Sequence, residues 1–503
     1  MSSHLTRVAV GLVPLALVPT LGAAGGGFRP DTWVWAGALA AWCAAVALAV
    51  SDHPGALRVS WPWLVGGGAV LLWTLASALW SVEPAQSVLE ARRTVVYAVV
   101  ALALVVLARR GGGSTVVAGA YAGVCLLVLY AVARYLFGAR HFVPFEGNLI
   151  SEPLGYANAV GILSALGILL SLAPATGGFR PRRAAAAALV PPLALALELS
   201  GSHASWLALA VGFAALVVLH PSPLTLARPL LALVAPTAFA FWVGQFSRLT
   251  DAGEPRLTGP VVFLLTLGGS AVAAVTAAKL HPRARRGRTL PRGTLVAAAA
   301  AVALLGAVVA LRAATDQPRT SYYRTAWSEY RAHPVLGSGA GTFGHYWVLS
   351  GLEATWGGAL DAHSLYLETL AELGPVGLAL LLAFLLYPLQ RAAARREQPW
   401  VPAATGATVA FLVHAGLDWD WELPAVVVAG LACAAGIAFA DEEPSTPLPR
   451  LARFAALAAA LLLGAAAIAG ARSTTEPSAA PQTAEAPRGG ASALEFSASL
   501  RYL

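Results

Sequence analysis

Two arginines and one histidine carry the chemistry that this sequence offers most plainly. Arg324 and Arg331 lie seven positions apart in a polar stretch, a spacing that places both side chains on one face of a helix. A guanidinium group can donate two parallel hydrogen bonds to a phosphate. His363 lies further along the same stretch, and an imidazole can take a proton from a hydroxyl group near neutral pH. These residue types indicate a site that binds a phosphate and deprotonates an alcohol.

Simpler interpretations of the same residues stay open on chemistry alone. Arginines beside a membrane can extend to lipid headgroups without any catalytic role. A single histidine in a loop is commonly no more than a solvated polar residue. The elements that would hold these side chains therefore matter as much as the residue types.

A helix over residues 321–332 is expected to hold the two arginines. Thr320 or Ser321 can cap its start, and His333-Pro334 ends it. Helical spacing gives it an aromatic stripe of Tyr323, Trp327 and Tyr330 beside a polar stripe of Arg324, Ser328 and Arg331. Such a pair of stripes is typical of a helix at the membrane interface, with the polar stripe toward water or a cavity.

Sharp turns are expected between this helix and His363. Residues 337–344 contain a formal GxGxxG pattern, but no βαβ unit surrounds it, so we interpret the glycines as turn formers and not as a dinucleotide site. Asp361 is expected to cap the following helix and to place His363 in its first turn. Glu368 and Glu372 follow on that helix, one turn apart.

The composition places this polar stretch inside a membrane protein. Of 503 residues, 58% are hydrophobic and 12% are charged, and the mean hydropathy is +0.68. Soluble domains carry about a quarter charged residues, so an ordinary soluble protein is excluded. The formal net charge is +8, and most of it lies in short loops, which indicates membrane orientation and not nucleic-acid binding. The cysteines, Cys43, Cys125 and Cys433, lie in apolar runs and are expected to be small buried residues.

The apolar runs predict an all-α polytopic membrane protein with about 12–15 transmembrane helices and one long extracytoplasmic loop that carries short amphipathic helices. Along the chain we expect four segments: N-terminal transmembrane helices in 1–315, the active-site loop in 316–364, C-terminal transmembrane helices in 365–471 and a disordered tail in 472–503. Individual runs at 294–315 and 451–471 are expected to be the last spans of the two helical segments.

Four basic loops set the expected orientation. They lie near residues 109–110, 180–183, 279–292 and 391–396, all on one side of the membrane if the predicted spans hold. The positive-inside rule makes that side cytoplasmic, so we expect a multi-pass protein of the inner or plasma membrane with a cytoplasmic N-terminus. Every polar cluster then faces the extracytoplasmic side, where nucleotide-activated substrates are absent. A lipid-linked donor is therefore expected.

Several blocks of the chain, taken in order, resemble the O-antigen ligase and polymerase superfamily. Three lie in the long loop and the helix after it: Arg324-x-x-Trp327, His-Pro-Val-Leu-Gly-Ser-Gly-Ala-Gly-Thr-Phe at 333–343, and Ala-His-Ser-Leu-Tyr-Leu-Glu-Thr-Leu-Ala-Glu-Leu-Gly at 362–374. Three more lie outside it: Leu-Gly-Tyr-Ala-Asn-Ala at 154–159, Ser-Gly-Ser-His-Ala-Ser at 200–205, and the aspartate-bearing stretch at 414–422. The resemblance covers roughly residues 60–440.

The resemblance implies an enzyme that moves a glycan from an undecaprenyl-pyrophosphate carrier to an acceptor hydroxyl, with inversion of the sugar linkage and without a metal or other cofactor. It implies that His363 is the base or the acceptor-positioning residue, and that Arg324 binds the pyrophosphate and stabilises the leaving group. It further implies substrate-binding roles for His203, Arg331, Asn158, Trp327, Glu372 and Asp418. Two departures from the family pattern are His203, where an arginine is usual, and Ser364, where an asparagine is usual.

Rival functions are also compatible with the sequence. A multi-pass transporter or flippase would place ionisable residues within its spans, facing a central path, and the sequence has few of these. An inactive scaffold of a glycan assembly complex is compatible with histidine at position 203. Within the enzymatic interpretation, ligase and polymerase differ in the acceptor, which can be a lipid, a glycan or a protein, and the sequence names neither the acceptor nor the sugar.

Overall fold

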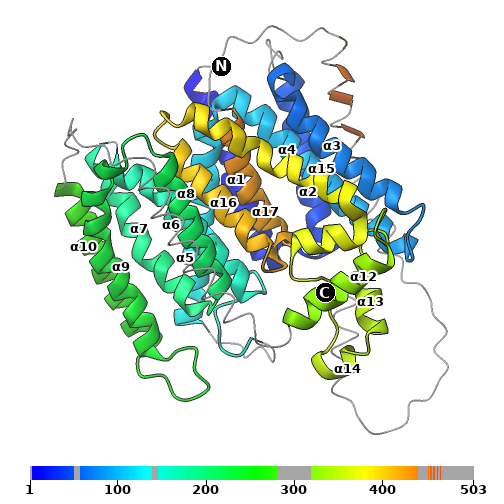
Figure 1. Ribbon diagram of the computed structural model, residues 1–503. Helices are drawn as coiled ribbons and strands as arrows, with labels where there is room; N and C mark the ends of the chain where they lie inside the picture. The colour runs from blue at the N-terminus through cyan, green and yellow to red at the C-terminus, as the bar shows by residue number, and fades with distance from the viewer. Residues whose placement is uncertain are drawn as a thin grey trace. The chain divides into compact units, whose positions relative to one another are not determined.

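The computed structural model describes residues 3–49, 57–138, 146–177, 179–279 and 319–439, together with scattered positions between 451 and 465. Throughout these ranges the regular structure is helical and contains no β-strand (Figure 1). The prediction of an all-α fold is confirmed.

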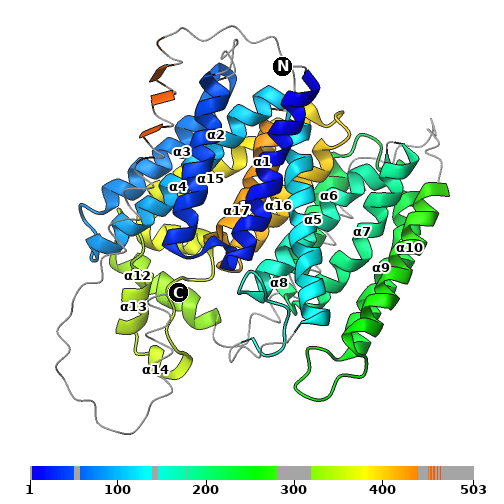
Figure 2. The same ribbon diagram turned by 180° about the vertical axis from the view of Figure 1, so that it is seen from behind.

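The chain forms two compact units, each assembled from stretches that are distant in sequence. The first unit comprises Met1–Gly26, Leu104–Ala313 and Leu385–Ser445. Its described helices are α1 (Ser3–Ala23), α5 (Gly113–Phe137), α6 (Ala157–Thr176), α7 (Arg180–Leu199), α8 (His203–Leu219), α9 (Ala227–Ser247), α10 (Gly259–Lys279), α16 (Val401–Ala415) and α17 (Pro424–Ala438), with short 3₁₀ turns η3 (Pro223–Thr225) and η4 (Asp420–Glu422). The same helices are seen from behind in Figure 2.

Helix α6 lies at the centre of the first unit. It packs against α5, α7, α8 and α16, and most of its side chains are buried. Beside it, α8 and α16 approach each other closely through glycines. A Cβ added at Gly212 of α8 would lie 2.5 Å from the carbonyl oxygen of Gly406 on α16. Small residues at a membrane helix contact allow this backbone approach, which brings the polar ends of α8 and α16 together.

The second unit comprises Gly27–Ala103, Ala314–Phe384 and Thr446–Leu503. Its described helices are α2 (Pro30–Ala49), α3 (Leu57–Ser77), the first part of α4 (Pro84–Gly111), α12 (Arg319–Ala332), α13 (Phe343–Leu349), α14 (Glu353–Trp356) and the first part of α15 (Leu365–Arg395). The last parts of α4 and α15 belong to the first unit, and the 3₁₀ turn η1 (Gly25–Gly27), before α2, contains the boundary between the units along the chain. The units thus combine stretches from different segments of the predicted linear division.

The short helices of the long polar loop are present, and their boundaries correct one prediction. Helix α12 begins at Arg319, two residues before the expected start, and ends at Ala332, as expected. Thr320 and Ser321 therefore lie inside the first turn and do not cap it from outside.

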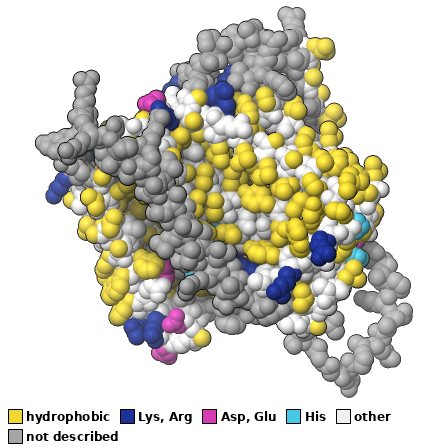
Figure 3. Space-filling view, viewed as in Figure 1, with side chains coloured by type: hydrophobic (Ala, Val, Ile, Leu, Met, Phe, Trp, Pro, Cys, Tyr) yellow, Lys and Arg dark blue, Asp and Glu magenta, His cyan; other side chains and the backbone are white. Residues whose placement is uncertain are grey.

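Six described helices are long and apolar enough to cross a membrane: residues 84–109, 113–137, 157–176, 229–247, 259–279 and 365–395. Five shorter apolar helices accompany them, at residues 7–23, 62–77, 203–219, 401–415 and 424–438. In Figure 3 hydrophobic side chains spread widely over the visible face, as expected of helices that contact lipid. The chain is a polytopic membrane protein.

Some predicted segments lie outside the described residues. They are the expected span at 294–315, most of that at 451–471, the arginines at 283–292 and the tail at 472–503.

Two arginines of the basic loops have a second role that the orientation argument did not include. Arg395 is buried and donates to the carbonyl oxygens of Ile437, at 2.9 Å, and Ala438, at the end of α17. Arg183 is buried as well, and its Nε donates to the carbonyl oxygen of Ala277 in the last turn of α10, at 3.4 Å. A cation at a helix carboxyl end satisfies free carbonyl groups and complements the helix dipole. These arginines therefore also hold helix ends within the first unit.

Candidate active site

Helix α12 presents one packed face and one exposed face in the second unit. Tyr322 and Ala326 are buried in a hydrophobic cluster with Phe343 and Trp347 of α13. The opposite face exposes Arg324, Ser328 and Arg331, as the predicted polar stripe requires. Within the described part of the chain, neither of these guanidinium groups has a carboxylate partner, so both are available to an anion. Trp327 is 50% exposed beside them and contacts the ring of Tyr330, with 5.3 Å between ring centroids.

His363 precedes helix α15, and this corrects the prediction that it lies in the first turn. The helix begins at Leu365, and His363 has a left-handed backbone with φ of 52°. Non-glycine residues adopt this conformation only where their surroundings hold them in it. Here Asp361 Oδ1 accepts from the backbone N–H of His363 at 3.0 Å, and Glu368 Oε2 accepts from the N–H of Ala362 at 2.6 Å. Two carboxylates thus hold this turn against the start of α15.

The imidazole of His363 is fixed on two sides. Asp361 Oδ1 lies 2.7 Å from Nδ1, and the two side chains are only 12–13% exposed. The ring of Tyr322 stacks on the imidazole with 4.4 Å between centroids and 20° between planes. The two atoms lie at ion-pair distance without hydrogen-bond alignment between them, and the negative charge beside Nδ1 favours the tautomer that carries its proton there, with the lone pair on Nε2. The geometry suits a general base acting through Nε2.

The glycine-rich segment at 337–344 lies on the first turns of α15. Glu372 is buried, and its two carboxylate oxygens accept from the backbone N–H groups of Gly341 at 2.8 Å and Phe343 at 3.0 Å. Its own carbonyl accepts from the N–H of Gly339 at 2.8 Å. Both carboxylate oxygens are therefore occupied by the protein itself. This is the sharp turn expected from the glycines, but it leaves Glu372 as a residue that holds the loop.

Glu329, on the packed face of α12, supports the same segment from the other side. Its side chain is fully buried, and Oε1 accepts from the hydroxyl groups of Ser338 at 2.6 Å and Thr342 at 2.9 Å. Its Oε2 has no hydrogen-bond partner among the residues that the structure describes. Burial raises the pKa of Glu329 to about 7, although the two hydroxyl contacts oppose the shift. This carboxyl group can therefore hold a proton close to neutral pH.

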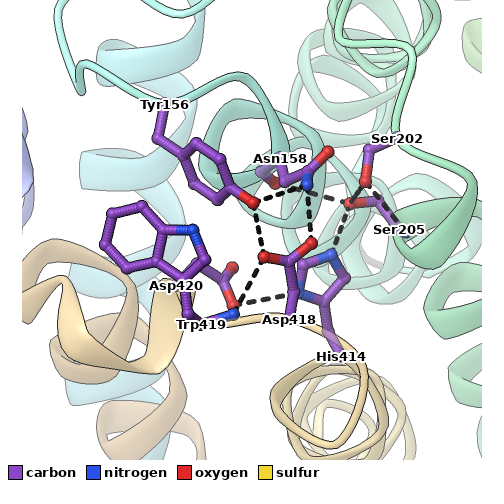
Figure 4. Close-up of polar contacts among 8 residues, drawn as sticks. All are labelled: Tyr156, Asn158, Ser202, Ser205, His414, Asp418, Trp419 and Asp420. Carbon is purple, nitrogen blue, oxygen red and sulfur yellow. Dashed lines mark hydrogen bonds and ion pairs between the residues drawn. The ribbon is translucent and has the colours of Figure 1, made fainter. Parts of the chain in front are cut away.

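In the first unit, Asn158 and Asp418 lie together (Figure 4). Asp418 is fully buried and accepts from Asn158 Nδ2 at 2.6 Å, from the Tyr156 hydroxyl at 2.5 Å and from the backbone N–H of Trp419 at 2.8 Å. Asn158 also donates to the Tyr156 hydroxyl at 2.8 Å. Asp418 therefore orients Asn158 and Tyr156 and has no oxygen turned to solvent. Asn158, at the start of α6, is the half-buried member of this pair.

Beside this pair lies a second polar group at the meeting point of α8 and α16 (Figure 4). Ser205 Oγ lies 2.9 Å from His414 Nε2, and His414 Nδ1 lies 3.0 Å from Asp420 Oδ1. Burial raises the pKa of Asp420, and its contact with His414 opposes the rise. His203 is exposed at the first position of α8, next to the buried capping residue Ser202.

The predicted site residues thus fall into two sets. Arg324, Arg331, Trp327, His363 and Glu372 belong to the second unit, and Asn158, His203 and Asp418 belong to the first. The sequence analysis gave no individual role to the following residues of these arrangements, although four of them lie in blocks that resemble the family: Tyr156, Ser205, Tyr322, Glu329, His414 and Asp420. Asp361 was noted only as a helix cap. Among the described residues, no group of three or more His, Cys, Asp or Glu side chains is arranged to hold a metal ion.

In a comparison with protein families, residues 185–382 match a family model described as O-antigen ligase. The matched segment includes α12–α15 up to residue 382 and contains Arg324, Arg331 and His363, while Asn158 and Asp418 lie outside it. A search of curated proteins gives no match.

Proposed function

The chain belongs to the O-antigen ligase and polymerase superfamily through residues 185–382, and from this premise we propose that it transfers a glycan from an undecaprenyl-pyrophosphate carrier to an acceptor hydroxyl on the extracytoplasmic face of the membrane. The family match supports a membrane glycan ligase or polymerase.

His363 acts as the general base for the acceptor. The carboxylate of Asp361 holds the proton on Nδ1, so Nε2 takes the proton from the acceptor hydroxyl as its oxygen attacks the anomeric carbon of the donor. The bond from that carbon to the diphosphate oxygen breaks with its electron pair, and undecaprenyl pyrophosphate leaves. Attack from the face opposite the leaving group inverts the linkage. Positioned proton transfer of this kind contributes about 10²–10⁴-fold to rate.

Arg324 and Arg331 serve the leaving group. Both guanidinium groups are exposed on one stripe of α12 and have no carboxylate partner among the described residues, so an incoming diphosphate displaces no ion pair there. Their charge opposes the negative charge that grows on the diphosphate as the glycosidic bond breaks. Trp327 adds an apolar surface beside them, suited to the lipid or to a sugar face.

His203 and Asn158 are proposed as polar contacts of the lipid-linked substrate, because both present side chains at helix starts and neither is fully buried. Asp418 acts through Asn158, since its own oxygens are occupied. Glu372 acts through the loop that it holds. Asp418 and Glu372 are therefore proposed to position other groups and not to contact the substrate directly.

One observation carries the proposal: a histidine held in a left-handed turn, with a carboxylate on Nδ1, lies beside an arginine-bearing helix within the family-matching segment. The test measures undecaprenyl-pyrophosphate-linked glycan in a deletion strain that carries wild type, His363→Ala or, as a matched control, His220→Ala. We expect the lipid-linked pool to rise on deletion and to fall again with wild type and His220→Ala only. Full complementation by His363→Ala at normal protein level would reject the transfer chemistry and favour a transporter or a scaffold.

A further inference from the structure

A line of buried polar side chains joins α8, α16 and the segment after α16. The Oγ atoms of Ser202 and Ser205 are 2.8 Å apart, Ser205 Oγ lies 2.9 Å from His414 Nε2, and His414 Nδ1 lies 3.0 Å from Asp420 Oδ1. None of these four side chains is more than 3% exposed. Figure 4 shows them converging from two helices and a turn. We call these four residues the relay.

The order serine, histidine, aspartate is that of an activated serine nucleophile. Burial argues against that role. Ser205 has no exposed surface, and its hydroxyl is already within hydrogen-bond distance of both Ser202 and His414. A substrate carbon or phosphorus atom would have to replace one of these contacts inside packed helices. The same geometry is better suited to fixing backbone position.

The relay ends at the first turn of α8. Ser202 caps this helix by accepting from the N–H of Ser205 at 3.2 Å, and the next residue, His203, is exposed. The turn packs closely on α6: a Cβ added at Gly161 would lie 2.7 Å from the Oγ atoms of Ser200 and Ser205. Hydrogen bonds in such an apolar setting have no competing water, and removal of one partner leaves the other unsatisfied. The turn therefore has little freedom while the relay is intact.

We propose that Ser205 and His414 are positioning residues that fix the first turn of α8 and, through it, the place of the His203 side chain at the substrate. The proposal rests on the proposed function only in the role of His203. The relay itself is a property of the fold and can be tested without turnover.

The chain offers informative substitutions. In His414→Gln the amide lies near the position of Nε2 and keeps the contact with Ser205, whereas in His414→Asn the amide lies near Nδ1 and keeps only the contact with Asp420. Ser205→Ala removes the hydroxyl. Ser164→Ala is its matched control, because Ser164 is equally buried but its hydroxyl donates to Val160 of its own helix.

The first measurement is hydrogen–deuterium exchange of the peptide spanning 200–206 in the purified protein. We expect exchange at least tenfold faster in Ser205→Ala and His414→Asn, and close to wild type in His414→Gln and Ser164→Ala, measured at a temperature well below the Tm of every variant. Equal exchange in Ser205→Ala and Ser164→Ala would overturn the relay.

The second measurement is the Kd for undecaprenyl pyrophosphate. We expect about a fivefold rise in Ser205→Ala, rescue in His414→Gln, and no further rise when Ser205→Ala is added to His203→Ala, since both act through one side chain. Additive effects would overturn the link to His203, and labelling of Ser205 by a fluorophosphonate would overturn the positioning role. Failure of the proposed function has a different signature, full complementation by His363→Ala, and leaves the exchange result unchanged.

Discussion

Asp361 and Tyr322 together fix the imidazole and the main chain of His363. Nδ1 faces a carboxylate 2.7 Å away, while the ring plane is set by the stacked Tyr322. The backbone N–H of the same histidine also binds Asp361, so one carboxylate fixes both the main chain and the tautomer. Loss of the charge alone should therefore weaken catalysis without dismantling the turn.

Asp361→Asn tests this. The amide keeps an oxygen for the backbone N–H but no longer favours a proton on Nδ1, so we expect kcat to fall about 100-fold with little change in KM. The control is Glu353→Gln, which removes a carboxylate from α14 in the same loop. A kcat for Asp361→Asn within twofold of the control would show that the tautomer of His363 does not limit transfer.

Glu329 provides a pH-dependent contribution to stability. Its pKa in the folded protein is about 7, above the ordinary value of 4.5, so the native state binds this proton more tightly than the unfolded chain does. The resulting stabilisation, ~3 kcal/mol at most, is complete below about pH 4.5 and is lost as the pH rises through 7.

Glu329→Gln should therefore flatten the pH dependence of Tm. We expect a variant that is more thermostable than wild type at pH 8 and no more thermostable at pH 5, because glutamine keeps an oxygen for Ser338 and Thr342 and carries no charge. Thermal unfolding at both pH values measures it. An equal Tm difference at pH 5 and pH 8 would contradict ionisation of this buried group.

Residue types and order along the chain were enough to predict the exposed arginine stripe and the importance of His363. They were not enough to find its partners. Asp361 lies two positions away, but its contact with Nδ1 depends on a left-handed backbone, which no local pattern announces. Glu329 cannot be told from other acidic residues of a polar helix by sequence, because its burial depends on the glycine-rich segment that packs over it. Ser205 and His414 are 209 positions apart, so only the packing of α8 on α16 brings them together.

At the scale of elements, the glycine-rich segment packs closely against the start of α15 and is hydrogen-bonded to it. Gly337, Gly339 and Gly341 all have left-handed backbones, with φ of 75°, 109° and 75°. Their hydrogen atoms face neighbouring main chain or side chains where a Cβ would not fit. Two glycines of the formal GxGxxG pattern are thus explained by close packing within the second unit, Gly339 against Ser81 and Gly341 against the side chain of Glu90, and not by a nucleotide.

Gly337→Ala and Gly351→Ala form a matched pair within this loop. Both glycines have nearly the same φ, 75° and 70°, but a Cβ at Gly337 would lie 2.2 Å from the carbonyl oxygen of Glu372, whereas one at Gly351 meets nothing within 4 Å. We expect about 1 kcal/mol of strain in Gly351→Ala and a larger loss of Tm in Gly337→Ala, which must also displace the loop from α15. Equal Tm values for the two variants would contradict the close approach.

The presence of each helix was easier to predict from the sequence than the residues at which it begins and ends. Long apolar stretches predicted the membrane helices, and the aromatic and polar stripes predicted α12. Helix starts were less predictable, because Asp361 and Glu368 bind the turn before α15 and move its first residue past His363. The assembly of two units from interleaved stretches had no local signal either.

At the scale of the whole molecule, the donor class depends on which side of the membrane the α12 stripe faces. The loop arginines predict which side of the membrane is cytoplasmic. Arg183 and Arg395, however, also bind helix carbonyl groups, so packing as well as membrane orientation can explain why arginines occupy these positions. Orientation therefore needs a measurement that does not use these residues.

Labelling of single introduced cysteines provides this measurement of orientation. Cys43 is replaced first, whereas Cys125 and Cys433 can stay because they are buried. Ser328 is exposed on α12, and Ser222 is exposed in the turn after α8. We expect a membrane-impermeant maleimide to label Ser328→Cys in intact spheroplasts and Ser222→Cys only after permeabilisation. The reverse pattern would place the arginine stripe and His363 in the cytoplasm, where nucleotide-activated sugars are available, and the argument for a lipid-linked donor would then fail even if His363 were still the base.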